Sequence, residues 1–498
     1  MKKTSIILAL SALVVGLLPS CKKNSSSTEK TTLSTPVYQI GQAITPGNLS
    51  ANSYKGTMTT GNQYTLTGDF TINIGDTVLL QPGVTVCVKP GVTIIVKGVL
   101  ISLGTQANPN FFTTCGVNPI DQIGNPVTAD PAWNNGLGSW TGINCDTSCK
   151  LLDLQWTHIE YVGAAFATTE PFVGGSSGTT SFGILFQNPN GNLILTDSWI
   201  YGTVDDAIRM AGGHVYLARN TLEKMGYLGG DGFNAKNGTQ GDMCFNLCIG
   251  SATNSTKCSN KGGSFAECNI NMYNNTYVDC GYRQASYESR GSNIDYEQSG
   301  EGLCYNNLVV NCRNGIRVSD GQNSIPFPDT SHTVAQYNYI YADSIQEVDQ
   351  FYPTTAGTWD AINTYVIPTS TQYPLPADFR DVTSNPNQDD LYVPAPATLA
   401  TANNPMFVNF PLPEPVQGFS LAAITSINTG KTVTGSAYNF RLKAGSPAIG
   451  IGYTGFSPLQ NIVSPVTAYV KNPNFAPVIS QPGVDMGCYQ SNGSGNQH

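Results

Sequence analysis

The chain has 498 residues with a formal net charge of −9, and only 11% of them are charged, against 40% that are hydrophobic. A nucleic-acid-binding surface is basic, and a disordered chain is highly charged with few aromatic residues, so this composition argues against both classes. Polarity comes instead from Asn, Thr, Ser, Gly and Tyr. Abundant Gly and Pro with few helix signals favour strands and turns. We therefore expect a β-rich exported protein with no nucleic-acid partner.

The amino-terminal residues resemble an export signal. Two lysines precede an apolar run over residues 6–18, which is too short to span a bilayer and predicts a signal peptide over 1–20. The run ends in LLPSC at 17–21, which resembles the lipobox of bacterial lipoproteins. That resemblance implies that Cys21 carries the lipid, and several acyl chains on one residue anchor a protein stably. The alternative is an ordinary signal peptide with an incidental cysteine. The polar residues 21–36 predict a flexible tether.

The strongest periodic signal lies at residues 77–105, TVLLQPGVTVCVKPGVTIIVKGVLISLGT. Apolar residues alternate there with other residues, and a period of two marks half-buried strands. The PG turns at 82–83 and 90–91 are too short for helical crossovers, so short strands must turn through corners while one apolar face stays inward. This pattern predicts an all-β coil, a β-helix, which we place over residues 37–345.

An Asn comes just before an apolar strand in five fragments, ARNTLEKMG, CFNLCIGS, YNNTYVDCG, YNNLVVNCR and QYNYIYAD. Their spacing is about one solenoid coil, within the roughly 20–45 residues of stacked repeats. One Asn at the same corner of every coil would form a hydrogen-bonded amide ladder. We place this ladder on Asn220, Asn246, Asn275, Asn307 and Asn338.

The ladder register makes a second prediction. Ser198 and Thr157 occupy the equivalent places upstream of the first ladder Asn. Cys280 and Cys312 each lie five residues after their ladder Asn, so they should stack in neighbouring coils about 4.8 Å apart, either as a disulfide or as paired thiols.

The cysteine count is compatible with further disulfides. Of 13 cysteines, 12 remain when Cys21 is set aside, and an even number suits an exported chain. The spacings of Cys145 with Cys149 and of Cys244 with Cys248 lack the paired CxxC pattern of a zinc site. Disulfides or stacked packing are the better interpretation.

A second column of short strands appears in GILF (183–186), AIRM (207–210), GFNA (232–235) and GIRV (315–318). Alternation directs one set of side chains inward, namely Ile184, Ile208, Phe233 and Ile316. The other set points outward, namely Leu185, Arg209, Asn234 and Arg317. ASYES at 285–289 is a further, weaker match, with Tyr287 outward.

Several segments resemble right-handed parallel β-helix surface proteins of Bacteroidetes-type bacteria. They are the run from GDTVLLQ (75–81) to residue 105, NPNFFTT (108–114), WTGI (140–143), NNPMFVN (403–409), YNFRLKAGSPAIGIG (438–452) and VDMGCYQ (484–490). Members commonly have an acidic residue in place of Asn404 and GAYE-like residues in place of GCYQ. The resemblance covers most of 60–345 and a band near 403–490. It implies the pectin-lyase-like superfold, which hosts lyases, hydrolases, adhesins and proteins without activity.

Two further segments complete the predicted organisation. Residues 346–402 are rich in Pro, Thr and Tyr without periodicity, which predicts an irregular excursion, a cap or a lid. Residues 403–498 form the closing β-helix segment and the carboxyl terminus.

The candidate site is the outward face of the second column, since carbohydrate-active β-helices bind substrate along such a face. Asp206 and Asp231 precede strands of adjacent coils, with backbones about 5 Å apart. Paired carboxylates could divide acid and base roles in glycoside hydrolysis. Arg209 and Arg317 could hold a uronate carboxylate bidentately or serve as the base of a lyase.

Part of this face is weakly similar to polygalacturonases. VDDAI (204–208) is similar to their double-aspartate segment, which carries over onto Asp205 and Asp206, and GIRV is faintly similar to their late arginine motif, which carries over onto Arg317. The expected GHG motif is missing, because His214 lies in GGHVY. In the alternative interpretation, the aspartates only bond backbone amides at turns.

The richest acidic stretch is YESRGSNIDYEQSGEG (287–302), which contains Glu288, Asp295, Glu297 and Glu301. Its spacing is not that of an EF-hand loop, so a solvated turn is favoured over a calcium site. We expect no metal or other cofactor.

Two functions follow as hypotheses. The first is an outer-membrane lipoprotein at the cell surface, or at the periplasmic face, that binds a glycan or a neighbouring cell-envelope protein without catalysis. The second is a polysaccharide lyase or glycoside hydrolase that acts on acidic glycan along the outward face. A rigid spacer is a third, purely structural role.

Overall fold

The computed structural model describes residues 38–115, 138–166, 178–226, 229–260, 267–282, 293–297, 300–313, 315–319, 333–341, 404–410, 439–459 and 477–498. Two short antiparallel strands, β31 (Trp359–Asp360) and β32 (Tyr365–Val366), are described by their backbone. The described residues belong to one compact unit, Tyr38–His498. The predicted signal peptide, Cys21 and the tether lie outside the described residues, as does the predicted excursion apart from β31 and β32.

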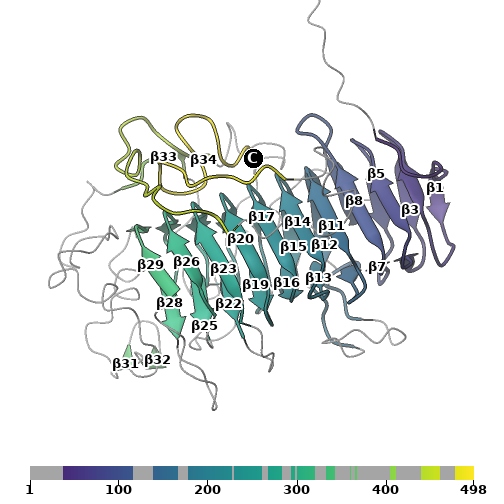
Figure 1. The fold of residues 1–498 in the computed structure, drawn as a ribbon, viewed down its shortest axis with the longest axis horizontal. Helices are drawn as coiled ribbons and strands as arrows, with labels where there is room; N and C mark the ends of the chain where they lie inside the picture. Colours follow the sequence, from purple (N-terminus) through teal and green to yellow (C-terminus); the bar gives the residue numbers. More distant parts are fainter. Residues whose placement is uncertain are drawn as a thin grey trace, which may run out of the picture. The chain divides into compact units, whose positions relative to one another are not determined.

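The described chain is a right-handed parallel β-helix built from three parallel sheets (Figure 1). Successive strands enter the ten-stranded, the eleven-stranded and then the nine-stranded sheet, and the cycle repeats in each coil. The predicted fold class is thereby confirmed.

The ten-stranded sheet contains β2 (Gly56–Met58), β5 (Thr77–Leu80), β8 (Val99–Leu103), β11 (Leu151–Gln155), β14 (Asn192–Thr196), β17 (His214–Ala218), β20 (Gln240–Cys244), β23 (Asn269–Tyr273), β26 (Gly302–Tyr305) and β29 (Thr333–Gln336). The eleven-stranded sheet contains β1 (Gly47–Leu49), β3 (Gln63–Leu66), β6 (Thr85–Val88), β9 (Asn110–Thr114), β12 (Thr157–Val162), β15 (Trp199–Thr203), β18 (Thr221–Glu223), β21 (Leu247–Ile249), β24 (Thr276–Val278), β27 (Leu308–Val310) and β30 (Tyr339–Tyr341). The nine-stranded sheet contains β4 (Phe70–Ile72), β7 (Thr93–Val96), β10 (Gly142–Cys145), β13 (Ile184–Phe186), β16 (Ile208–Ala211), β19 (Phe233–Lys236), β22 (Thr256–Ser259), β25 (Ile294–Glu297) and β28 (Ile316–Ser319).

Inward side chains stack on the same position of neighbouring coils. Ile184 lies opposite Ile208, and Ile208 lies opposite Phe233. These residues and Ile316 are buried in one continuous core, where each side chain of this size contributes about 1.5–3 kcal/mol. The strand before β28 in this sheet is β25. ASYES (285–289), the weaker match for this column, lies outside the described residues.

The corner between the ten-stranded and the eleven-stranded sheet repeats one backbone conformation. The residue before each ladder position has a left-handed φ between 48° and 59°. These residues are Trp156, Asp197, Arg219, Phe245, Asn274, Asn306 and Tyr337. A single left-handed residue turns the chain sharply, and it costs a non-glycine residue about 1–2 kcal/mol. The side chain that follows it at each corner must therefore offset that strain.

The hydrogen bonds of Asn246 show how the corner is stabilised. Its backbone N–H and its side-chain Nδ2 both donate to Asn275 Oδ1 at 3.0 Å, and Nδ2 also donates to the Leu217 carbonyl at 2.9 Å. The same three bonds recur at Asn220, Asn275 and Asn307, and the last of these donates to Asn338. All five side chains are fully buried.

The corner column continues upstream with hydroxyl side chains. The Ser198 backbone N–H donates to Asn220 Oδ1 at 3.1 Å, and the Thr157 backbone N–H donates to Ser198 Oγ at 3.0 Å. Amide and hydroxyl groups thus satisfy the same buried backbone donors from coil to coil.

The carboxyl-terminal segment packs back along the β-helix (Figure 1). It contains β33 (Phe407–Asn409) and β34 (Asn439–Leu442), which pair with each other as antiparallel strands. Corner side chains bind its backbone, since Asn306 Nδ2 donates to the Tyr453 carbonyl at 2.7 Å and Tyr453 N donates to Asn306 Oδ1 at 2.8 Å. The Cys488 N–H donates to Thr276 Oγ1 on the eleven-stranded sheet at 2.9 Å. This segment lies along the corner between the ten-stranded and the eleven-stranded sheet.

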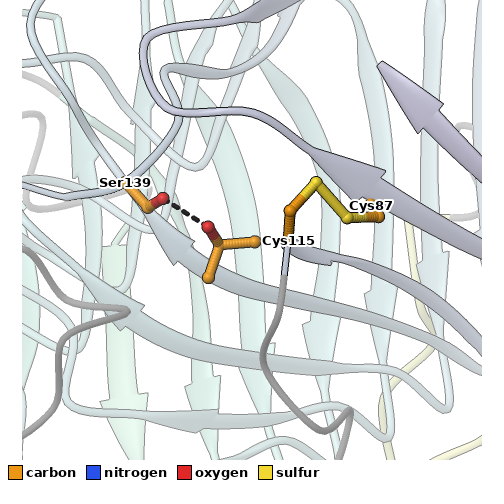
Figure 2. Close-up of a disulfide and its surroundings, with 4 residues drawn as sticks. Cys87, Cys115 and Ser139 are labelled. Atoms are coloured by element: carbon orange, nitrogen blue, oxygen red, sulfur yellow. Dashed lines mark hydrogen bonds between the residues drawn. A yellow bond between two sulfur atoms is a disulfide. The ribbon is translucent and has the colours of Figure 1, made fainter. Parts of the chain in front are cut away.

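Cysteines are present both as a disulfide and as buried thiols. Cys87 on β6 is bonded to Cys115, directly after the neighbouring strand β9, and Ser139 lies close by (Figure 2). Cys280 and Cys312 lie in neighbouring coils as free thiols, and the Cys280 backbone N–H donates to Cys312 Sγ at 3.4 Å.

Candidate binding face on the nine-stranded sheet

The outward side of the nine-stranded sheet carries a polar and charged row through five adjacent strands. The strand register places its members opposite one another in the order Arg209, Asn234, Lys257, Asp295 and Arg317. They belong to β16, β19, β22, β25 and β28. Five strands at about 4.8 Å spacing make a row about 19 Å long.

A second row lies two residues further along the same strands. Lys236, Ser259 and Glu297 occupy it in register. Residues two apart on a strand point to the same side, so both rows belong to one face. We call the two rows together the charged face.

The predicted carboxylate pair lies at the turn that precedes these strands. Asp206 Oδ1 accepts the backbone N–H of Asp231 at 2.8 Å. Asp231 Oδ1 in turn accepts the backbone N–H of Asn254 at 3.0 Å. These bonds repeat the arrangement of the asparagine corner with carboxylates, and they hold successive coils together. Asp206 and Asp231 are adjacent, and both carboxylates bond backbone amides.

The other carboxylate oxygens are also occupied. Asp206 Oδ2 accepts Arg209 Nε at 2.7 Å and Asn234 Nδ2 at 2.9 Å. Asp231 Oδ2 accepts the same Asn234 amide at 3.0 Å. Asp206 and Asp231 are 1% and 5% exposed. Burial, and next the charge of Asp206, raises the pKa of Asp231. Both groups are saturated by structural bonds, which favours the interpretation that they stabilise the turn.

Asp205 differs from its two neighbours. It is only partly buried, and its Oδ1 accepts the backbone N–H of Asp206 at 2.9 Å. Burial, followed by the charge of Asp206, raises the pKa of Asp205 to about 7. Its carboxyl group is therefore partly protonated near neutral pH, as a general acid would be.

Besides Arg317, which is described by its backbone alone, three cations lie on the charged face, and two of these three are paired. Arg209 bonds Asp206, and its guanidinium also lies 4.1 Å from the ring centroid of Phe182. Lys257 Nζ lies 2.7 Å from Glu297 Oε1 and 3.8 Å from Asp295 Oδ2. In both cases the cation offsets the free-energy cost of burying the carboxylates, and the carboxylates fix the position of the cation.

Lys236 is the third cation whose side chain is described. It forms no ion pair with any residue in the described part of the chain. Burial, followed by the charges of Lys257 and Arg209, lowers its pKa to about 8. At neutral pH it is mostly protonated, so it offers a half-buried positive charge to an incoming anion.

Asn234 lies between the paired cations and has one unused atom. Its Nδ2 bonds both Asp206 and Asp231, but Oδ1 is buried and has no hydrogen-bond partner among the described residues. Buried acceptors without a partner cost about 1–3 kcal/mol.

The remaining predicted site residues do not all converge. Arg317 is described by its backbone register, which sets it opposite Asp295. Glu301 accepts Asn269 Nδ2 at 2.8 Å at the start of β23 in the ten-stranded sheet, away from the charged face, and Glu288 lies outside the described residues. His214 begins β17 of the ten-stranded sheet. Within the described ranges, no group of three or more His, Cys, Asp or Glu side chains could hold a metal ion.

The sequence did not assign four residues to this face, namely Lys257, Asp295, Lys236 and Glu297. Asp295 and Glu297 were noted only as members of the acidic stretch 287–302. Lys236 directly follows the fragment GFNA and ends β19. The fragments that carry the other three residues, TKCS and IDYE, do alternate like the other members of the column. They were overlooked because the segments around them differ in length from coil to coil, which hides the repeat. A search for alternation alone would have found them.

Comparisons of the chain with protein-family models, with curated proteins and with solved structures found no match. None of the described residues belongs to a helix that is long and apolar enough to cross a membrane.

Proposed function

We propose that this protein is an exported, lipid-anchored β-helix that binds a glycan along the charged face. The single observation that supports this most is the in-register row of Arg209, Asn234 and Lys257. A straight row about 19 Å long suits an extended polymer better than a small ligand. Its alternating amide, cationic and acidic groups match the hydroxyls and carboxylates of an acidic polysaccharide.

Lys236 favours an anionic sugar over a neutral one. It is an unpaired, half-buried cation within the described residues, on a chain whose net charge is −9. A uronate unit supplies the carboxylate that this ammonium group lacks.

The binding proposal is tested by titration calorimetry of the purified protein with an oligogalacturonate and with a neutral glucan oligosaccharide. We expect the oligogalacturonate to bind, and Lys236→Met to weaken that binding about tenfold, which is 1.4 kcal/mol. Lys55→Met is the matched control, because Lys55 is 76% exposed and pairs with Asp76 away from this face. Equal affinity of Lys236→Met and the unchanged protein would contradict the proposal.

A protein of the cell envelope is the other partner that the charged face could bind. Pull-down from envelope extracts with the unchanged protein and with Lys236→Met would detect it. Capture that depends on Lys236, with no oligogalacturonate binding, would replace the glycan by a protein partner.

The membrane address is part of the proposal and rests on the amino-terminal sequence. We propose that Cys21 is acylated and that the protein is held at the outer membrane with its folded part at the cell surface. Incorporation of a labelled fatty acid into the unchanged protein, and its loss in Cys21→Ser, would support this. Protease treatment of intact cells separates the surface from the periplasmic face. A Cys21→Ser protein that stays with the membrane would contradict the anchor.

A second candidate function, lyase or hydrolase action on an acidic glycan, is favoured by Asp205. Its carboxyl group is partly exposed and its raised pKa of about 7 suits a proton donor beside Asp206. New reducing ends or unsaturated products from a panel of uronate polymers would support catalysis. Activity that Asp205→Asn leaves unchanged would exclude this residue as the acid.

A further inference from the structure

Two pairs of buried cysteines lie at the same corner of the β-helix in different coils. Cys145 is the last residue of β10, and Cys258 is near the end of β22. The register relates them through Phe186, Met210 and Ala235, each opposite the next. Cys145 and Cys258 therefore occupy the same inward position at the end of the nine-stranded sheet.

The partner cysteines lie across the turn from that position. Cys149 comes two residues before β11, and Cys268 comes directly before β23; both strands belong to the ten-stranded sheet. The Cys145 thiol is in hydrogen-bonding contact with that of Cys149. The Cys258 thiol contacts both the thiol of Cys268 and its carbonyl oxygen, the latter at 3.5 Å.

Sequence spacing alone does not single out these pairs. Cys244 and Cys248 have the same spacing as Cys145 and Cys149, but they lie on β20 and β21, on either side of the left-handed corner residue Phe245. The Cys244 thiol contacts Tyr273 and Tyr216. The spacing is the same in both pairs, so only the tertiary structure distinguishes Cys145 and Cys149 from Cys244 and Cys248.

We propose that Cys145 with Cys149, and Cys258 with Cys268, are oxidised to disulfides that close the corner between the nine-stranded and the ten-stranded sheet. The inference uses the exported location proposed above, because an oxidising compartment maintains such bonds. The second bond would fix the chain beside Lys257 and Ser259, so it would also hold part of the charged face in place.

The oxidant is a protein disulfide of the oxidase class. One cysteine thiolate attacks that disulfide to form a mixed disulfide, and the second thiolate displaces the oxidase sulfur. Two protein thiols lose two protons and two electrons, and the oxidase leaves as a dithiol. All four cysteines are fully buried in the folded chain. Burial, followed by contact with the partner thiol, raises the pKa values of Cys145 and Cys258. Oxidation therefore takes place before or during folding, while thiolates are accessible.

The test is disulfide mapping of the full chain, refolded from the reduced state in a glutathione redox buffer. Free thiols are alkylated in denaturant and the peptides are identified by mass spectrometry. We expect the disulfides Cys145–Cys149 and Cys258–Cys268, with Cys87–Cys115 as the positive reference and Cys244 alkylated. Alkylation of all four corner cysteines, or their linkage to other cysteines, would overturn the proposal.

Single substitutions give a second readout. In Cys268→Ser, the thiol of Cys258 should become fully alkylated while Cys145–Cys149 stays closed. Cys244→Ser is the control and should leave both corner bonds intact. A Cys258 that remains blocked in Cys268→Ser would show that its partner is a different residue. Because refolding is done in a defined buffer, failure here is distinct from failure of the proposed export or glycan binding.

Discussion

Asp206 accepts the backbone N–H of Asp231, one coil further along, at 2.8 Å. In bonding a backbone N–H of the next coil, the two aspartates resemble the ladder asparagines more than a catalytic acid and base pair. Asp231 repeats the bond toward Asn254 in the following coil. The charged face is therefore built on a turn whose Asp206 and Asp231 carboxylates are already engaged, and the partly exposed groups left for a ligand belong to Asp205 and Lys236.

Replacement of Asp206 should weaken the fold. Asp206→Ala removes the acceptor of the Asp231 N–H, of Arg209 Nε and of Asn234 Nδ2. Hydrogen bonds to charged groups contribute about 1.5–3 kcal/mol, so we expect the free energy of unfolding to fall by about 3 kcal/mol in urea titrations. Asp76→Ala, which breaks a surface pair with Lys55, should cost less than about 1 kcal/mol. Equal losses in the two variants would contradict a structural role for Asp206.

A substitution inside the asparagine ladder should have a comparable effect. In Asn246→Ala, the backbone N–H and the side-chain amide of Asn220 both lose their acceptor, and the Leu217 carbonyl loses a donor. Each unsatisfied buried group costs about 1–3 kcal/mol, so we expect a loss of about 3 kcal/mol by chemical denaturation. Asn48→Ala on the exposed strand β1 is the control. Unchanged stability of Asn246→Ala would show that water replaces the ladder.

Glycan binding should weaken as the pH rises through about 8. Burial, followed by the charges of Lys257 and Arg209, lowers the pKa of Lys236 to about 8, so its charge is present at pH 7 and largely lost at pH 9. Calorimetric titrations with oligogalacturonate across this range should show the affinity falling. Lys236→Arg stays protonated throughout and should bind with little dependence on pH between 7 and 9. The same pH profile in both proteins would assign the effect to another group.

Glu223 should make the fold less stable as the pH rises. Burial raises its pKa to about 8, and neither carboxylate oxygen has a hydrogen-bond partner among the described residues. An unfolded Glu titrates near its model value of 4.5, so folding takes up a proton between pH 4.5 and 8. The stability that the protonated form contributes is complete below about 4.5 and is lost progressively up to about 8.

Glu223→Gln isolates that contribution because glutamine does not titrate. The stability of the variant relative to the unchanged protein should rise between pH 4.5 and 8, by an amount on the order of 4 kcal/mol. Urea unfolding at a series of pH values measures it. A constant difference between the two proteins would show that Glu223 is ionised in the fold.

The β-helix of this protein could be predicted from its sequence because the repeats are local. The period-two alternation at 77–105 and the recurrent asparagines predicted a coil whose corners all follow one rule, because a solenoid presents the same contacts to each repeat. The left-handed residues at the corners were not predicted, since Trp156, Phe245 and Tyr337 carry no turn signature of their own. Stacking on the neighbouring coil holds them in that conformation.

The charged face could be predicted only in part. Arg209, Asn234 and Arg317 were assigned to it because their strands lie in recognisable fragments, whereas Lys257 and Asp295 follow segments of unequal length that break the repeat. The hydrogen bonds of Asp206 depended on which amide lies one coil away, a distance of 25 residues in sequence. Periodicity predicts which side chains point outward. The stacking of coils decides which of these side chains already form hydrogen bonds or ion pairs within the protein, and which remain available to a ligand.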